Sequence, residues 1–151
     1  LQVLHLACIS AVGRGCAARI LAVDIAGAFD RVSHAALLHK VRHLGIGGPL
    51  HTWLSSYLGG RSIQCLVGGQ TSSLYTISAG VPQGSILGPT LFLIYVNDAS
   101  ETLSPGAHLE AYADDTTLYS LISLDTSPAD AALSLQTSVD RLHQWGRRWR
   151  I

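Results

Sequence analysis

The spacing of apolar residues changes twice along this chain of 151 residues. Apolar positions recur at helical spacing over 33–58, alternate with polar ones over 61–78, and return to helical spacing after residue 127. A period near 3.6 predicts an amphipathic helix, whereas a period of two predicts a strand with one buried face. Because these helices and strands do not form repeated strand–helix–strand units, the pattern predicts an α+β fold.

Local start and stop signals place the individual elements. Ser33 and Ser127 have the residue type that caps a helix start, and the pair Gly68-Gly69 is typical of a hairpin turn. We expect helices at 3–12, 33–44, 49–58, 91–96 and from 128 onwards, strands at 19–25, 61–67, 72–78, 109–113 and 116–122, a turn at 26–32, and a polar loop at 97–106. Residues 20–23 and 91–96 are continuously apolar, which predicts that both segments are buried.

Composition narrows the class of protein. The chain has 48% hydrophobic and 13% charged residues, so it is not a disordered chain. Ten basic and ten acidic residues cancel, which gives no basic signal for nucleic acid. No apolar run approaches the roughly 18 residues of a membrane span, and the charged start of a secretion signal is missing. We therefore expect an intracellular protein, nuclear or cytoplasmic, with no membrane partner.

Two further features concern the cysteines and the chain ends. The three cysteines are an odd and sparse set whose spacing matches no zinc pattern, which favours a reducing compartment. The chain has no methionine, and its last residues continue a helical pattern. We expect it to be a piece of a longer protein.

Three aspartates lie beside apolar segments that should form a sheet. Asp24 ends the first strand, and Asp114 and Asp115 lie at the bend of the second hairpin. A carboxylate next to a sheet core is costly unless it is neutralised, and the arginines are too few and badly placed to serve all three. Two Mg²⁺ ions about 3.5–4 Å apart would neutralise them and support phosphoryl transfer. Ordinary turn chemistry also explains an Asp-Asp pair, so both interpretations remain open here.

A loop rich in glycine and proline, GVPQGSILGP, occupies residues 80–89. Its glycines, Gly80, Gly84 and Gly88, allow the backbone to approach a ligand closely. Gln83 can hold a sugar hydroxyl or a base without adding charge. The same residues also suit an ordinary loop before a buried helix.

These segments together resemble the palm of a reverse transcriptase of the non-LTR (LINE-like) retrotransposon type. LAVDIAGAFDRV (21–32) resembles the first carboxylate motif of that family, GVPQGSILGPTLF (80–92) its template–primer and nucleotide-binding motif, and AYADDTTLY (111–119) its catalytic Asp-Asp hairpin. WLSSYLGGRSIQCLVGGQTSS (53–73) also follows the family's usual sequence between motifs.

The resemblance covers about residues 19–150 and implies a fold. That fold is an α+β polymerase palm, in which a central antiparallel sheet packs on helices. Residues 1–18 would be the end of the fingers or a connecting helix, and residues 19–151 the palm. Part of the fingers and the thumb would be absent.

The resemblance also implies a metal site. Asp24 and Asp114 would hold two Mg²⁺ ions, with Mn²⁺ as the alternative ion, and the backbone carbonyl of Ile25 would help. Asp115 would be a supporting and weaker ligand. These three aspartates would be the catalytic residues.

Nucleotide and template contacts are implied for five further residues. Phe29 falls at the position of the steric gate, where its ring would clash with the 2′-hydroxyl of a ribonucleotide, although plain core packing also explains a phenylalanine. Gln83 and Gly84 would line the incoming nucleotide and the template base. Tyr112 and Ala113 would lie near the primer end.

The implied activity is that of an RNA-directed DNA polymerase within a retrotransposon polyprotein. Its partners would be an RNA template, a DNA primer and a dNTP, and we expect the isolated 151 residues to be inactive or nearly so. Asp30, Arg31 and Ser85 belong to the motifs but are assigned structural roles. Gly27 departs from the family, which usually has lysine or a similar polar residue there. The sequence does not define the oligomeric state.

Three alternatives remain beside this hypothesis. The chain could be a non-catalytic remnant of a transposable element, in which only folding or partner binding survives. It could be another palm-type nucleotidyl transferase, such as an RNA-templated RNA polymerase, although Phe29 argues against ribonucleotide substrates. It could also be a simple metal-binding α+β domain, in which Gln83 would have no role.

Overall fold

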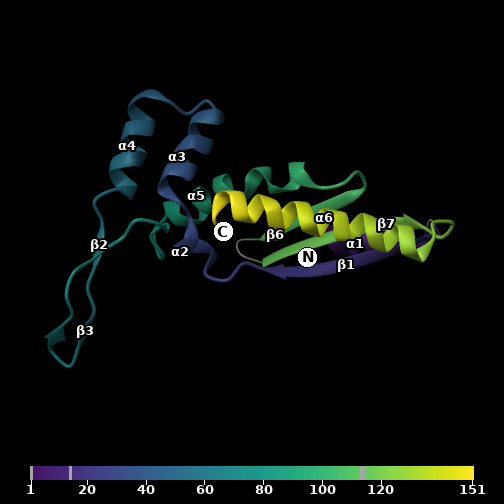
Figure 1. Cartoon of the computed structure of the whole chain (residues 1–151), viewed down its shortest axis with the longest axis horizontal. Helices are drawn as coiled ribbons and strands as arrows, with labels where there is room; N and C mark the ends of the chain where they lie inside the picture. Colours follow the sequence, from purple (N-terminus) through teal and green to yellow (C-terminus); the bar gives the residue numbers. More distant parts are fainter. Residues whose placement is uncertain (1, 14, 113–114) are drawn as a thin grey trace. The chain divides into compact units, whose positions relative to one another are not determined.

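Helices and antiparallel strands alternate irregularly along the chain, as the changes in apolar spacing predict (Figure 1). The computed structural model describes residues 2–13, 15–112 and 115–151. Two units can be distinguished: Leu1–Ala26 with Asn97–Arg148, and Gly27–Val96 with Trp149–Ile151. The predicted α+β class is confirmed, whereas the predicted division into 1–18 and 19–151 stays a prediction.

The first unit is built on a three-stranded antiparallel sheet with the order β1–β7–β6 (Figure 1). Strand β1 (Cys16–Asp24) pairs with β7 (Asp115–Ser123) over nine register positions, from one end of each strand to the other. Strand β6 (Ala107–Tyr112) pairs with β7 on its other side. The antiparallel pairing predicted for the arms of the second hairpin is therefore confirmed, and β7 is the central strand. Asp115 was expected at the bend, but it is the first residue of β7.

Three helical segments complete the first unit: α1 (Gln2–Gly13), η1 (Asn97–Thr102) and α6 (Pro128–Trp149), the last residue of which belongs to the second unit. Ser127 caps α6, since its Oγ accepts a hydrogen bond from the Asp130 amide at 3.2 Å. The polar loop predicted over 97–106 is wrong in its first part, which forms the 3₁₀ helix η1. None of the described helices combines the length and the apolar character that crossing a bilayer requires.

Helix α6 packs through one narrow face. Trp145 is buried, and its indole Nε1 donates to Asp98 Oδ1 at 2.9 Å. The hydroxyl of the buried Ser138 accepts a bond from the Ser104 amide at 3.3 Å. These contacts attach α6 to η1 and to the loop that follows it.

Strand β1 is less buried than its sequence predicts. Ile20 is 51% exposed and Leu21 is 38% exposed, whereas Leu118 on β7 is fully buried. The reason is position in the sheet: β7 has a neighbour on each side, whereas β1 has β7 alone among the described strands. An apolar run therefore does not by itself distinguish a central strand from an edge strand.

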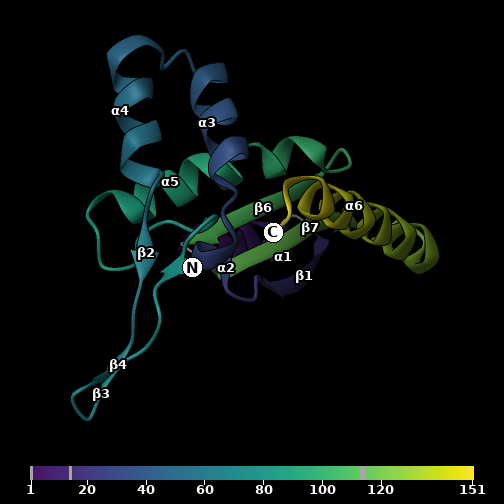
Figure 2. The same ribbon diagram turned by 60° about the vertical axis from the view of Figure 1, so that its left-hand side comes forward.

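The second unit contains four helices, namely α2 (Ala28–Arg31), α3 (His34–His43), α4 (Gly48–Leu58) and α5 (Leu87–Val96) (Figure 2). The segment 26–32 was expected to turn the chain, and it does so partly by forming the single helical turn α2. Ser33 caps α3, as predicted, by accepting a bond from the Ala36 amide at 3.4 Å. The unit's fully or nearly fully buried apolar core is formed by Val32, Leu37, Val41, Leu58, Leu91, Phe92 and Tyr95.

Helix α5 is buried on one face only. Leu91, Phe92 and Tyr95 are buried, whereas Leu93 is 49% exposed. The prediction of a fully buried helix is therefore wrong. Helix α3 packs against α5, and Phe29 of α2 stacks on Phe92. These neighbours cover one face of the helix and leave Leu93 outside it.

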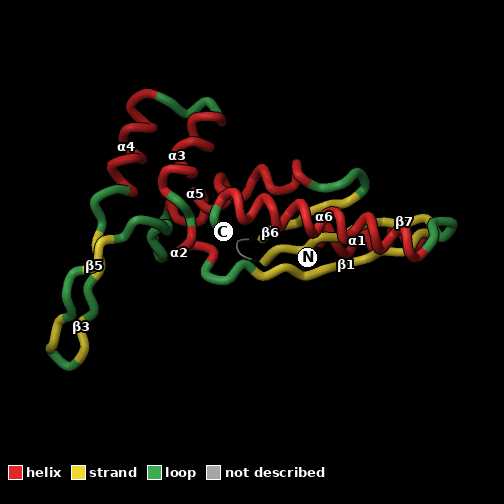
Figure 3. Tube along the Cα trace, viewed as in Figure 1, coloured by secondary structure: helices red, strands yellow, loops and turns green. Residues whose placement is uncertain are grey.

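A long hairpin leaves the helices of this unit between residues 61 and 77. It has two short ladders, β2 (Ser62–Ile63) with β5 (Tyr75–Thr76) and β3 (Leu66–Val67) with β4 (Gln70–Thr71), separated by loop (Figure 3). Its tip is the predicted glycine pair, and both glycines have a positive φ, as a tight hairpin turn requires.

The burial predicted for this hairpin is wrong. Every residue from 62 to 76 is exposed, and Val67 is 76% exposed. The alternation predicts a strand with a buried face, but no described element covers either face of the ladders.

Candidate active site

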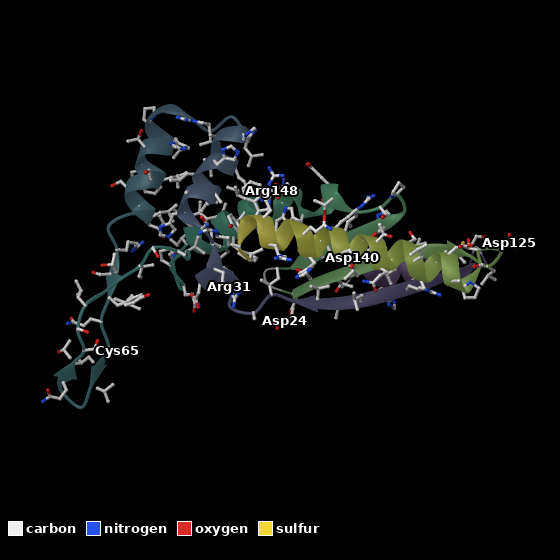
Figure 4. The ribbon with its side chains drawn as sticks, in the orientation of Figure 1. Asp24, Arg31, Cys65, Asp125, Asp140 and Arg148 are labelled. Carbon is white, nitrogen blue, oxygen red and sulfur yellow. The ribbon has the colours of Figure 1, made fainter. Side chains whose placement is uncertain are left out.

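Asp24 and Asp115 oppose each other at one end of the three-stranded sheet. Asp24 is the last residue of β1, Asp115 is the first residue of β7, and the two are register partners. Directly opposed residues in antiparallel strands project to the same face, with Cα atoms about 4.5–5.5 Å apart. The structure thus brings together two of the three predicted aspartates. Figure 4 shows Asp24 at this end of the unit and Asp125 at the other.

The length of the β1–β7 ladder fixes this pairing. Nine consecutive register pairs connect the two strands. A slip of one residue would move every side chain of β7 to the opposite face and remove the fully buried Leu118 from its place in the core. The long ladder therefore fixes Asp115, the first residue of β7, opposite Asp24.

The electrostatic surroundings differ from the sequence-based expectation. Both Asp24 and Asp115 are exposed, so the cost of burying a carboxylate beside a sheet core does not apply to this pair. The strand ends extend beyond the apolar rows of the sheet, and water can reach the carboxylates. Like charges directly opposite each other still destabilise a strand pair, and a divalent cation would relieve that repulsion.

The donor chemistry of this sheet end suits a hard cation. Carboxylate and backbone carbonyl oxygens are the ligands of Mg²⁺, which keeps several waters and so favours an open site. The carbonyl of Ile25 follows Asp24 directly in the sequence. Among the described residues no group of three or more His, Cys, Asp or Glu side chains is close enough to hold a metal. Asp114 and Ala113 lie outside the described residues, so their roles stay predictions.

The backbone of Tyr112 flanks the carboxylate pair on the third strand. Tyr112 is the register partner of Asp115 on β6, just as Asp24 is its partner on β1. Asp115 is therefore held from both sides by ladder pairs. The predicted role of Tyr112 near a primer end stays a prediction.

Tyr119 lies four residues along β7 from Asp115, on the same face of the strand by alternation. Its ring is buried and stacks on His108, with ring centroids 5.1 Å apart. Burial raises the pKa of the Tyr119 phenol above its ordinary value of 10.0, and the charges of Glu110 and Cys8 raise it further. The phenol therefore stays neutral at physiological pH.

The second unit carries the other predicted residues, beginning with Phe29 on α2. Its ring stacks on that of Phe92, with centroids 4.8 Å apart and planes inclined by 25°. Phe92 on α5 is fully buried, whereas Phe29 is half-buried. Core packing accordingly accounts for one part of the Phe29 ring and leaves the rest accessible.

Gln83 and Gly84 lie at the exposed part of the 80–89 loop. The Gln83 amide Nε2 donates to Asp30 Oδ1 at 3.0 Å. Gly84 has a φ of 77°, and no heavy atom lies within 4 Å of the position that a Cβ would take there. Gly84 therefore leaves open space beside Gln83.

The other two glycines of the loop have a different role from the one predicted. A Cβ on Gly80 would lie 3.1 Å from backbone atoms of Asp30, and one on Gly88 would lie 2.8 Å from the Pro82 carbonyl oxygen. Both glycines thus allow the protein chain to approach itself rather than a ligand. The structural role assigned to Ser85 agrees with its hydrogen bonds, since its Oγ donates to Pro82 O at 2.6 Å and accepts from Gly88 N at 3.0 Å.

Comparison with known proteins decides the family. The profile described as "Reverse transcriptase (RNA-dependent DNA polymerase)" matches residues 10–151. The chain belongs to the reverse transcriptase family. The resemblance of its sequence motifs to non-LTR retrotransposon polymerases is confirmed.

Several reverse transcriptases of mobile elements are similar to the chain. The "RNA-directed DNA polymerase from mobile element jockey" of Drosophila melanogaster is 36% identical over 135 residues, which cover 85% of this chain and 14% of that protein. The "Probable RNA-directed DNA polymerase from transposon X-element" of the same species is 35% identical over 134 residues, covering 87% and 14%. The R2 Pol polyprotein of Popillia japonica is 32% identical over 130 residues, covering 79% and 21%. The chain thus spans about a seventh to a fifth of these relatives.

Sequence reasoning did not find three supporting contacts of this reverse transcriptase segment, although it assigned Asp30 a structural role. Asp30 binds Gln83, Phe92 supports Phe29, and the His34 ring nitrogen Nε2 lies 2.7 Å from the carbonyl oxygen of Gly80. The partners of each contact lie 46 to 63 residues apart in the sequence. No local spacing rule connects positions so far apart, although the motifs themselves contain most of these residues.

Proposed function

We propose that the chain is the palm part of an RNA-directed DNA polymerase, which extends a DNA primer with dNTPs on an RNA template. The observation that carries this proposal is the opposition of Asp24 and Asp115 at exposed strand ends. Membership of the reverse transcriptase family supports it. The similar proteins named above are RNA-directed DNA polymerases by name, and they support RNA as the template. The chain matches only a part of their length.

In this proposal the sheet end holds two divalent cations, Mg²⁺ or alternatively Mn²⁺. Asp24 and Asp114 would be the main ligands, the Ile25 carbonyl would assist, and Asp115 would be the weaker ligand. The exposure of Asp24 and Asp115 supports this assignment, because hydrated Mg²⁺ needs ligands that water can reach. Bound ions of this kind make a hydroxyl more acidic and neutralise a departing pyrophosphate.

The proposed reaction is one nucleotidyl transfer for each template base. A bond forms between the primer 3′-oxygen and the α-phosphorus of the dNTP. The bond from that phosphorus to the β-phosphate oxygen breaks, pyrophosphate leaves, and the proton of the primer hydroxyl passes to solvent. Asp24, Asp114 and Asp115 supply the negative charge that the ions require. Tyr112 and Ala113 would lie beside the primer end.

In this proposal Phe29 selects deoxyribonucleotides over ribonucleotides. Because its ring is stacked on the fully buried Phe92, it cannot easily move away from an added hydroxyl. A ring held on one side and accessible on the other is the arrangement that a steric test of the 2′ position requires. Gln83 and Gly84 would contact the incoming nucleotide and the template base.

The test is primer extension by the complete reading frame that carries this chain, on an RNA template with dNTPs and Mg²⁺. We expect Asp24→Asn and Asp114→Asn each to lower the rate at least about 100-fold, since removal of even an outer-shell partner of a metal ligand costs about 10–100-fold. The matched control is Asp125→Asn, because Asp125 is an exposed aspartate of the same unit at the other end of the sheet (Figure 4). It should extend the primer as the unaltered protein does.

Other outcomes of the primer-extension test would support a different site or a different function. Unchanged extension by Asp24→Asn would refute the site assignment. Extension with NTPs in place of dNTPs would identify an RNA polymerase of the palm type. An unaltered reading frame that is inactive with both Mg²⁺ and Mn²⁺ would favour a non-catalytic remnant.

A further inference from the structure

We propose that Asp30 is a positioning residue, which fixes the orientation of the Gln83 side-chain amide toward an incoming nucleotide. That Gln83 faces a nucleotide rests on the proposed polymerase function. That Asp30 orients the Gln83 amide does not depend on activity. It stands on the hydrogen bond from Gln83 Nε2 to Asp30 Oδ1, 3.0 Å long, which joins α2 to the 80–89 loop.

The local backbone holds Asp30 in place. Helix α2 is one turn long, and the amides of Asp30 and Arg31 both donate to the Gly27 carbonyl, at 3.0 and 3.1 Å. Gly27 itself has a φ of 64°, a left-handed conformation that suits glycine. The position of the Asp30 backbone, from which the carboxylate projects, is thereby set by its own short helix.

The start of the loop is tied by backbone bonds to the same helix and to Val32, the residue that follows it. The Val81 amide donates to the Phe29 carbonyl at 2.9 Å, and the Gly80 amide donates to the Val32 carbonyl at 2.7 Å. Gly80 approaches Asp30 so closely that a Cβ there would lie 3.1 Å from the Asp30 backbone. Two residues beyond this tie, Gln83 lies within reach of the Asp30 carboxylate.

A histidine on the next helix strengthens this tie. His34 Nε2 lies 2.7 Å from the Gly80 carbonyl oxygen, and since a carbonyl only accepts, the ring nitrogen donates. Gly80 is therefore held through its amide by Val32 and through its carbonyl by His34 of α3. Because the loop's entry is fixed, the remaining freedom of Gln83 lies mainly in its own side chain.

The chemistry of the Gln83–Asp30 pair determines which end of the Gln83 amide faces Asp30. A carboxylate accepts hydrogen bonds and cannot donate them, so it selects the amide nitrogen of Gln83. The amide oxygen and the second N–H of Gln83 stay available for a nucleotide. Without Asp30 the amide would rotate freely, and binding a nucleotide would then carry the additional cost of ordering that side chain.

The functional test compares variants of the complete reading frame in primer extension. We expect Asp30→Ala to raise the KM for dNTP about three- to tenfold, the range that a net hydrogen bond supplies, while kcat changes less than about twofold. Asp30→Asn should restore KM to within about twofold, because its side-chain oxygen can accept the same bond. The double variant Asp30→Ala/Gln83→Ala should be no worse than Gln83→Ala alone.

The structural test does not need activity. The side-chain amide signals of Gln83, assigned in ¹⁵N NMR spectra by their loss in Gln83→Ala, should shift toward those of a free amide in Asp30→Ala. They should keep their positions in the control Asp125→Asn.

The outcomes separate the two proposals. Unchanged amide signals in Asp30→Ala would overturn the inference, as would an unchanged KM, additive effects in the double variant, or no restoration by Asp30→Asn. An unaltered protein that extends no primer would refute the proposed function, while the amide signals would still decide whether Asp30 orients Gln83.

Discussion

Two antiparallel hairpins in the described part of the chain have opposite character. The β6–β7 hairpin is joined on its second side by β1, and its central strand contains the fully buried Leu118. The hairpin of residues 62–76 has two ladders of two residue pairs each, and all of its side chains are exposed. Only the first hairpin carries carboxylates that belong to the proposed metal site.

This difference shows what placing a charged pair requires. Isolated two-stranded hairpins are marginally stable in water, and register is strongly specified only where one face of a strand is buried. Asp115 is held by ladder pairs on both sides, whereas no described third strand fixes the register of the exposed hairpin. A site that needs two carboxylates at a fixed separation therefore belongs on the supported hairpin.

The largest stability difference that would test this comparison lies between Leu118→Ala and Val67→Ala. The first removes a fully buried side chain and should lower the free energy of unfolding by about 2–5 kcal/mol. The second trims a side chain that is 76% exposed and should change it by less than about 0.5 kcal/mol. Urea denaturation of the chain measures both. Equal losses would show that the exposed hairpin is supported as strongly as the sheet.

Hydrogen exchange sharpens the comparison without any substitution. The amides of 117–121 in the central strand should exchange at least about 100-fold more slowly than those of 66–71, because opening free energies range from near zero at exposed segments to the global value in core strands. Mass spectrometry of peptides from the two segments gives the ratio. Similar exchange in both segments would show that the two hairpins are equally stable.

The smallest expected effect concerns the tyrosines of the two hairpins at alkaline pH. Burial raises the pKa of Tyr119, so the unfolded chain loses this proton at lower pH than the folded chain does. The protonated Tyr119 phenol therefore contributes to the stability of the folded chain. This contribution is fully present below about pH 10, the pKa of tyrosine in the unfolded chain, and it is lost as the pH rises through the higher pKa of the folded chain.

The free energy of unfolding of the unaltered chain should fall between pH 8 and pH 10.5. In Tyr119→Phe this fall should be smaller, by less than about 1 kcal/mol. Tyr75→Phe, at an exposed position of the other hairpin, is the matched control and should leave that loss as it is. The measurement is urea denaturation at the two pH values. An equal slope for Tyr119→Phe and the unaltered chain would contradict the assignment.

Much of the fold could be predicted because its signals are local. Ser33 and Ser127 cap helices as their residue type predicts, and Gly68 with Gly69 forms the expected turn. Burial could not be predicted in the same way. Ile20 and Leu93 are as apolar as core residues, yet their exposure depends on which elements lie beside them, and sequence spacing does not record neighbours.

The candidate site likewise has a part that the sequence predicts and a part that it does not. The opposition of Asp24 and Asp115 agrees with the shared site that the resemblance implies, although Asp115, expected at the bend, is the first residue of β7. The catalytic and metal-binding roles of both stay predictions. The bond between Asp30 and Gln83 had no comparable signal, because it depends on how two separate segments come together. The roles of Asp114 and Ala113 stay predictions, since both lie outside the described residues.

The long ladder between β1 and β7 has a consequence for synthesis on the ribosome. Asp24 leaves the exit tunnel well before Asp115 has been translated, so the nascent chain carries the first carboxylate without its partner. Translation that stops anywhere in between releases a polypeptide with one half of the pair, in which β1 has no β7 to join.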